Sequence, residues 1–324
     1  GQIEGLAGED ALSSEAVREA MDLCVGCKGC KRDCPTGVDM AKMKVEFLQH
    51  YKAKHGHTLQ DKLVAHLPDY ARWAARLAPV LNLRNRMPLL AALTEKLLGL
   101  SAKRSLPEWQ MRHFFNTPPS AAQATASREE VLAATRGVVL FVDTFNGYLE
   151  SANAHAAVKV LQAAGYTVHV ATKLKDDGQH LCCGRTYLAS GMVDKAREKA
   201  SEVVQSLLPF AEKGLSIVGL EPSCLLTLRD ELLVMGLGEG AQKIAQQALL
   251  FEEFLAREAQ AGQLDELKAQ ITPVDRPVLL HGHCHQKAFD AVSPVMEVLR
   301  WIPGAKPQLI ESSCCGMAGS FGYE

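Results

Sequence analysis

Four cysteines within eleven residues constrain this chain more than any other feature of its sequence. Cys24, Cys27 and Cys30 follow one another at two-residue intervals, and Cys34 comes three residues later, directly before Pro35. The C-x2-C-x2-C-x3-C-P spacing is typical of thiolates that bind [4Fe–4S] clusters, where the fourth cysteine binds a second cluster. Zinc sites also use C-x2-C pairs, but they usually combine two separated pairs or add histidines. The spacing therefore favours an iron–sulfur site over a zinc site.

The other six cysteines also occur in patterns that favour metal binding. Two adjacent pairs are each followed by glycine, and two single cysteines lie in Glu-Pro-Ser-Cys and His-Gly-His-Cys-His segments. Adjacent cysteines are poorly suited to bridging each other, whereas a glycine beside them lets the backbone bend close to a cluster. The candidate metal ligands are thus Cys24, Cys27, Cys30, Cys34, Cys182, Cys183, Cys224, Cys284, Cys314 and Cys315.

Length and composition limit the class of protein. At 324 residues and 47% hydrophobic residues, the chain is long enough for two or three domains. The net charge of −2 gives no electrostatic basis for binding nucleic acid, and no apolar run approaches the length of a transmembrane helix. A secreted disulfide framework is disfavoured because the chain is long and shows no signal peptide. We therefore expect a cytoplasmic protein, with a peripheral contact at the inner face of the membrane left open.

The first third of the chain is predicted to be helical. Apolar residues recur at helical spacing in four stretches, at 39–51, 59–66, 70–81 and 89–98. A helical domain around the cysteine run resembles the helical ferredoxin type of flavin dehydrogenases, and we expect it over residues 1–115. The Pro-, Ser- and Ala-rich composition that follows predicts a linker over residues 116–136.

Strands alternate with helices from residue 137 onward. Apolar runs at 138–142, 167–171 and 216–220 are typical of strands buried on both faces, and helical patterns separate them at 152–164 and 192–208. This alternation predicts an open, parallel α/β lobe over residues 137–265. Cys182, Cys183 and Cys224 each come after a predicted strand. Because parallel α/β sheets carry their sites at the carboxyl ends of the strands, we expect these cysteines at that edge.

A second, incomplete copy of this lobe is predicted over residues 266–324. Its strands are expected at 277–281 and 307–311, with Cys284 after the first and Cys314-Cys315-Gly316 after the second. The counterpart of Cys224 would lie beyond residue 324. Because residue 1 is glycine and the second lobe stops early, we expect the chain to be a fragment of a longer protein.

The combination of these motifs resembles the iron–sulfur portion of bacterial FAD-linked 2-hydroxyacid dehydrogenases. Lobes with Cys-Cys-Gly also occur in glycolate oxidase iron–sulfur subunits, in anaerobic glycerol-3-phosphate dehydrogenase subunits and in heterodisulfide reductases. The resemblance rests on the cysteine run and on the segments 181–186, 220–230 and 314–322. It is strongest for fused enzymes of the D-lactate or D-2-hydroxyglutarate dehydrogenase type, and it covers nearly the whole chain.

The resemblance implies electron transfer through [4Fe–4S] clusters. FAD would lie on a missing N-terminal half, and no residue of this chain is expected to bind it. The partners would be an FAD-binding dehydrogenase domain or subunit and an acceptor such as a quinone or an electron-transfer protein. The whole enzyme would oxidise a D-2-hydroxy acid (lactate, 2-hydroxyglutarate or glycolate) to the 2-oxo acid. This chain alone is expected to be inactive, and its sequence identifies no catalytic residue.

Two alternatives remain open from the sequence. One is a heterodisulfide reductase-like thiol/disulfide subunit, although the first lobe has three cysteines where those enzymes have five. The other is a scaffold protein whose cysteines bind zinc.

The sequence allows more than one role for several charged residues and histidines near the cysteines. Lys28, Lys31 and Arg32 would either offset the charge of a bound cluster or form a solvated face. His281, His283 and His285 would line one face if the strand continued. They would carry protons to an acceptor, supply an unusual metal ligand or, as we favour, only pack or hydrogen-bond there. Arg185 and Arg229 would bind a carboxylate or the charge of a cluster or, as is more common, form salt bridges.

Overall fold

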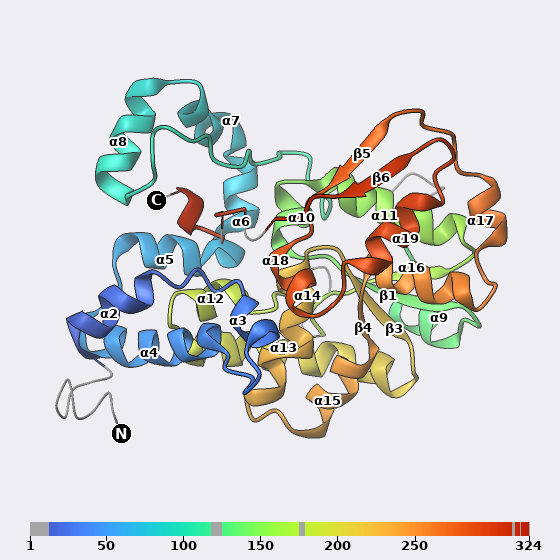
Figure 1. The fold of residues 1–324 in the computed structure, drawn as a ribbon, viewed down its shortest axis with the longest axis horizontal. Coiled ribbons are helices and arrows are strands. Elements are labelled where there is room, and N and C mark those ends of the chain that lie inside the picture. Colours follow the sequence, from blue (N-terminus) through green and yellow to red (C-terminus); the bar gives the residue numbers. More distant parts are fainter. Residues whose placement is uncertain (1–12, 118–124, 175–178, 313–314, 318, 324) are drawn as a thin grey trace.

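The computed structural model describes residues 13–117, 125–174, 179–312, 315–317 and 319–323. The fold is α/β, with many helices and two separate parallel sheets (Figure 1). Among the helices of these ranges, none is both long enough and apolar enough to cross a bilayer.

The N-terminal part is helical, and its helix ends follow local capping signals. It contains α2 (Glu15–Asp22), α3 (Gly29–Asp33), α4 (Met40–His55), α5 (Leu59–Ala65), α6 (Leu67–Arg76), α7 (Ala78–Leu81), the 3-10 helix η2 (Asn82–Asn85) and α8 (Pro88–Leu98). The Asp39 carboxylate caps α4 by accepting a hydrogen bond from the Lys42 amide, and Thr58 and Asp61 cap each other at the start of α5. The single helix predicted over 70–81 is broken at Leu77, because Pro79 cannot donate the amide hydrogen that would continue it.

A four-stranded parallel sheet forms the centre of the second part. Its strands are β1 (Gly137–Phe141), β2 (Thr167–Val170), β3 (Ser216–Gly219) and β4 (Ala248–Leu250), in the order β2-β1-β3-β4. The first three were predicted; β4 was not, because three residues carry too little pattern. β1 pairs with both neighbours, Val138 lying opposite Val168 and Ser216. Helix α9 (Arg128–Ala133) lies within the predicted linker and packs on β1 and β2.

Helices cover both faces of this sheet. They are α10 (Thr144–Tyr148), α11 (Ser151–Ala163), α12 (Arg185–Ala189), α13 (Val193–Glu212), α14 (Pro222–Arg229), η4 (Glu231–Val234), α15 (Gly238–Gln247), α16 (Phe251–Gln260) and α17 (Asp265–Ala269). Residues of β1 alternate between two cores, since Val139 packs with α13 and α15 while Leu140 packs with α11 and α16. Both faces are therefore buried, as the continuous apolar strand sequences predict.

The second sheet is a pair of parallel strands, β5 (Pro277–Leu280) and β6 (Lys306–Leu309), with α18 (Cys284–Ala288) and α19 (Ser293–Arg300) between them in sequence. Both strands were predicted. The pair is much more exposed than the four-stranded sheet, with Leu279 64% exposed. Helix α19 packs on α16 and joins this unit to the first lobe. The 3-10 helix η5 (Phe321–Tyr323) lies back against the N-terminal helices, where the Ser101 amide donates to the Tyr323 carbonyl at 2.7 Å (Figure 1).

An aromatic cluster joins the helical part to the sheet lobe. Tyr148 of α10 packs against Ala71 and Ala75 of α6, and the His113 ring lies 4.6 Å from the Tyr148 ring, centroid to centroid. Burial, helped by the charges of Arg72 and Arg76, lowers the pKa of His113 to about 4. The imidazole is therefore neutral in the folded protein at pH 7.

This histidine predicts a pH dependence of stability. Its pKa is lower in the folded chain than the ordinary value of 6.5, so the unfolded chain gains a proton first as pH falls. The contribution of His113 to the free energy of unfolding is therefore fully present above about pH 6.5. It falls by about 1–3 kcal/mol as the pH decreases toward 4. His113→Phe should flatten the slope of melting temperature against pH in this window. His50→Phe, at an exposed position of α4, should leave it unchanged. Equal slopes in the wild type and His113→Phe would contradict this account.

Candidate metal centre

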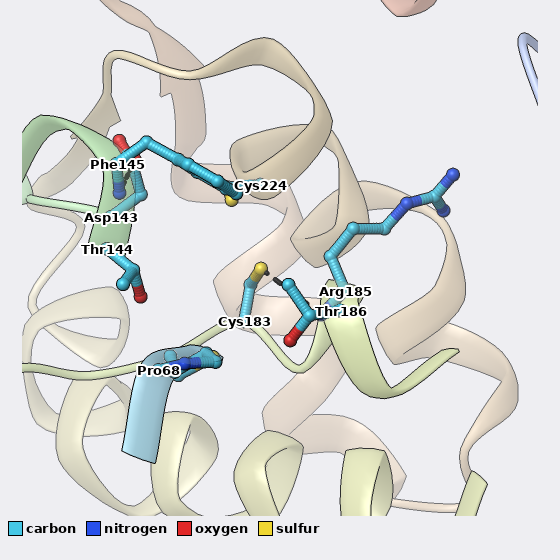
Figure 2. A pocket seen from close by; sticks show the side chains of 9 residues that line it. Pro68, Asp143, Thr144, Phe145, Cys183, Arg185, Thr186 and Cys224 are labelled. Carbon is cyan, nitrogen blue, oxygen red and sulfur yellow. Dashed lines mark hydrogen bonds between the residues drawn. The ribbon is translucent and has the colours of Figure 1, made fainter. Parts of the chain in front are cut away.

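A small cavity lies at the carboxyl edge of the four-stranded sheet. Its wall is built from the segments that follow β1, β2 and β3, together with the start of α6 (Figure 2). The lining residues are Pro68, Asp143, Thr144, Phe145, Cys182, Cys183, Arg185, Thr186 and Cys224. The three cysteines of the first lobe thus lie together at the predicted edge, while their role as metal ligands remains a prediction.

The three thiols are buried and contact one another. Cys182, Cys183 and Cys224 are 7%, 4% and 5% exposed, and the Cys183 thiol shares hydrogen bonds with the other two. Backbone amides also approach the sulfurs, since Gly184 donates to Cys182 Sγ and Arg185 to Cys183 Sγ, both at 3.4 Å. Gly184 has φ +82°, and a Cβ there would lie 3.0 Å from the Ala196 carbonyl oxygen. The glycine after the cysteine pair is therefore required by the turn.

The surroundings keep these thiols protonated. The hydrogen bond with Cys183 and burial raise the pKa of Cys182 well above its usual range. The hydrogen bond with Cys183 lowers the pKa of Cys224, but burial and the carboxylates of Glu221 and Asp143 outweigh it and raise that pKa. Metal binding at these thiols would have to release protons, because thiolates are the ligands.

The donor set suits a thiophilic metal. Three thiols that line one cavity are the ligand type of zinc and of iron–sulfur clusters, and the Asp143 carboxylate lines the same cavity. In the described ranges, no group of three or more His, Cys, Asp or Glu side chains is arranged around one metal-ion position. The sulfurs contact each other instead, so a bound metal would replace thiol–thiol contacts. All nine cysteines in these ranges are free of disulfides.

The sequence did not single out Asp143, which caps α10 beside this cavity. Its carboxylate accepts from the amides of Phe145 and Asn146 at 2.9 and 3.0 Å. Burial raises the pKa of Asp143 to about 6, although the hydrogen bonds from Asn146 oppose that shift. An Asp directly after a buried strand was the available signal, because this position commonly caps the next helix.

The N-terminal cysteine run forms a second cysteine group. Cys24 and Cys27 lie in the loop before α3, Cys30 lies within α3, and Cys34 caps its end. All four are half-buried. The Met40 amide donates to Cys30 Sγ at 3.3 Å. The run is thus held against the start of α4.

The second lobe adds one cysteine between these two groups. Cys284 begins α18, and α18 packs against both α3 and α14, the helices that carry Cys30 and Cys224. Cys315 is exposed, and Cys314 lies outside the described residues. Near Cys315, the Met317 sulfur accepts a contact from Arg104 of the helical part at 2.6 Å.

The histidines do not line one face of an extended strand, because β5 ends at Leu280 and a helix follows. His283 caps that helix by accepting from the His285 amide at 3.1 Å. His285 is buried, with Nε2 3.2 Å from the Gly26 carbonyl oxygen, and burial lowers its pKa to about 3. His283 therefore caps α18 and His285 packs in the interior, which is the role favoured from the sequence.

The charged residues divide into two kinds. Arg229 pairs with Glu253 at 2.8 Å and Arg185 with Glu231 at 2.6 Å, which confirms the predicted salt bridges. Arg32 pairs with its exposed neighbour Asp33. Lys28, in contrast, is 2% exposed, so the reading as a solvated face is wrong for this residue.

Comparisons with known proteins point to dehydrogenases. The chain is 28% identical over 322 residues to the D-2-hydroxyglutarate dehydrogenase of Pantoea ananatis and 28% over 327 residues to that of Escherichia coli K12, covering 98% of this chain and 30% of each relative. It is 27% identical over 283 residues to a subunit of the anaerobic glycerol-3-phosphate dehydrogenase of Escherichia coli K12, covering 86% of this chain and 67% of that relative. No family model and no solved structure matches. The chain thus spans less than a third of the D-2-hydroxyglutarate dehydrogenases that it matches.

The two cysteine groups should differ in reactivity when the protein is free of metal. Hydrogen bonds from Thr36 and from nearby backbone amides lower the pKa of Cys34, whereas Cys182, Cys183 and Cys224 have raised values. At pH 7 we expect Cys34 to react with N-ethylmaleimide at least about tenfold faster than these three, because the thiolate is the reactive form. Mass spectrometry of labelled peptides measures each rate. Thr36→Val should slow Cys34 alone, and equal rates for Cys34 and Cys183 would contradict the assignment.

Proposed function

We propose that this chain is the iron–sulfur electron-transfer part of an FAD-linked oxidoreductase. The observation that carries the proposal is the placement of two cysteine groups, one in the N-terminal run and one at the sheet edge, on helices that pack around α18. Cys30 and Cys224 lie on helices that both pack against α18, and such proximity suits a path for electrons, since transfer depends on short distances between sites.

The donor chemistry supports clusters at both groups. Cys24, Cys27, Cys30 and Cys34 have the cluster spacing, and the buried thiols of the sheet edge offer sulfur ligands with amides directed at the sulfurs. Iron–sulfur clusters, when bound, accept and release single electrons at potentials set by burial and by such hydrogen bonds. The Cys284 and Cys315 thiols are further candidate ligands, as is Cys314.

The relatives suggest the substrate class. Two are named D-2-hydroxyglutarate dehydrogenases, and a third is a glycerol-3-phosphate dehydrogenase subunit. In our proposal a D-2-hydroxy acid (2-hydroxyglutarate, lactate or glycolate) loses two electrons and two protons at a flavin outside this chain and becomes the 2-oxo acid. The electrons then leave singly through this chain to a quinone or an electron-transfer protein.

The proposal includes the partner and the compartment. An FAD-binding dehydrogenase domain or subunit supplies the electrons, as the name of one relative, itself a dehydrogenase subunit, suggests. The nine cysteines of the described ranges form no disulfides, which suits a reducing cytoplasm, where thiols are kept for metals. The thiol/disulfide and zinc alternatives use the same cysteines, so metal analysis distinguishes them.

Protein purified without oxygen should therefore contain iron and acid-labile sulfide. We expect brown protein whose dithionite-reduced form has an electron paramagnetic resonance (EPR) signal of [4Fe–4S] type. Cys183→Ser should lose the iron of the sheet-edge group and keep that of the N-terminal run, because the serine hydroxyl is a poor ligand for this metal.

The matched control is Ser190→Ala, which changes a buried serine near the end of α12 and leaves every cysteine in place. It should keep the wild-type iron content. Colourless protein that contains zinc in place of iron would contradict the proposal.

A further inference from the structure

A buried ion network joins the cysteine run to the helix that carries Cys224. Lys28, between Cys27 and Cys30, forms ion pairs with Asp230 and with Glu231, the latter at 2.6 Å. Asp230 ends α14, whose first turn contains Cys224. Lys28 and Asp230 are separated by 202 positions in the sequence, so the contact fixes two distant segments against each other.

Further cations complete this network. Lys31 and Lys42 donate to Asp230 Oδ1 at 2.9 and 2.6 Å. Arg185, two residues after Cys183, pairs with Glu231 at 2.6 Å. The network therefore joins four segments, namely the cysteine run, the start of α4, the start of α12 directly after the sheet-edge cysteine pair, and the end of α14.

The position of Lys28 is unfavourable in two respects. Its φ of +61° lies in the left-handed region, which suits glycine and strains a lysine. Its side chain is 1% exposed, and taking an ammonium group out of water is costly even when it is paired. A residue that is strained and buried in this way needs the surrounding structure to hold it, and such residues cluster at functional sites.

We propose that Lys28 is a positioning residue that clamps the Cys24–Cys34 loop against the helix and loop of the sheet-edge cysteines, keeping the two cysteine groups at a fixed spacing. This inference rests on the proposed function, because the clamp serves electron transfer between those groups. Two further contacts also hold this loop in place. His285 Nε2 lies 3.2 Å from the Gly26 carbonyl oxygen, and Lys44 donates to the Cys24 carbonyl at 2.8 Å.

Lys28→Met tests the clamp without leaving either carboxylate, Asp230 or Glu231, without an ion-pair partner. Asp230 keeps Lys31 and Lys42, and Glu231 keeps Arg185, so the variant should fold. In metal-free protein we expect exchange of the Lys31 and Cys34 amides, which close the turns of α3, to become about tenfold faster or more. The Ile217 amide of β3 should keep its wild-type rate, since the sheet is untouched.

Three further variants separate a clamp from a general structural effect. Lys28→Gly relieves the left-handed strain but removes the charge, so the clamp predicts faster exchange while a purely backbone role predicts slower exchange. Lys28→Arg keeps the charge and should restore much of the protection. Lys243→Met removes an exposed pair with Glu212 and should change nothing.

The metal-loaded protein gives a second readout. In the wild type, reduced clusters at the two groups should broaden each other's EPR signals, and Lys28→Met should weaken this magnetic interaction while iron content stays the same. If Lys28→Met matches Lys243→Met in both exchange and EPR coupling, the clamp is wrong. If the wild type binds no iron, the proposed function fails, and the exchange rates alone then decide whether Lys28 clamps the loop.

Discussion

The parallel pairing of β1 with both of its neighbours is the constraint on which the rest of the lobe depends. Because β2, β1 and β3 run in one direction, the segments that leave their carboxyl ends emerge at one edge of the sheet. Asp143, the Cys182–Cys183 pair and Cys224 meet there although 81 positions separate the first from the last. Each of these segments leads directly or through a tight turn into a helix, so the starts of helices form much of the cavity wall.

Much of this fold could be predicted from the sequence, and the exceptions have physical reasons. The strands at 138, 167, 216 and 277 were recognisable because each is rich in apolar or β-branched residues, whereas the strand at 307 was predicted from its place in the repeat, before the second Cys-Cys-Gly. β4 was missed because Ala248–Leu250 is short and is bounded directly by helices, so its apolar residues continue the pattern of α15 and α16. The break at Leu77 was also missed, although Pro79 two residues later is the local signal for it.

The position of the sheet-edge cysteines could be predicted from the sequence, but the electrostatics around them could not. Cysteine spacing and position after strands are local properties, and they placed Cys182, Cys183 and Cys224 correctly at the sheet edge. The partner of Lys28, in contrast, lies 202 positions away, and an ion pair between two distant segments has no signature in either of them. A lysine between two cysteines therefore suggested either a charge that offsets a bound cluster or a solvated face, and the folded chain excludes the second because Lys28 is buried. Asp143 was missed for a similar reason, since its burial depends on the packing of α10 against α6.

The charge balance of the network explains why a lysine at position 28 is compatible with the fold. Lys28, Lys31, Lys42 and Arg185 share two carboxylates, and the third acid nearby, Asp39, lies 4.0 Å from Lys31. Burial acts to raise the pKa of Asp230, but hydrogen bonds from Lys28, Lys42 and Lys31 outweigh it and hold that pKa far below its usual range. The network itself therefore contains four cations and three acids, while the carboxylates of Glu221 and Asp143 lie on the side of Cys224. In the proposed function, metal-bound thiolates of the cysteine run would carry negative charge and would be attracted by Lys28 and Lys31, which lie within the run itself. The residues that hold the cysteine loop in place would thereby also offset part of the charge of a bound cluster.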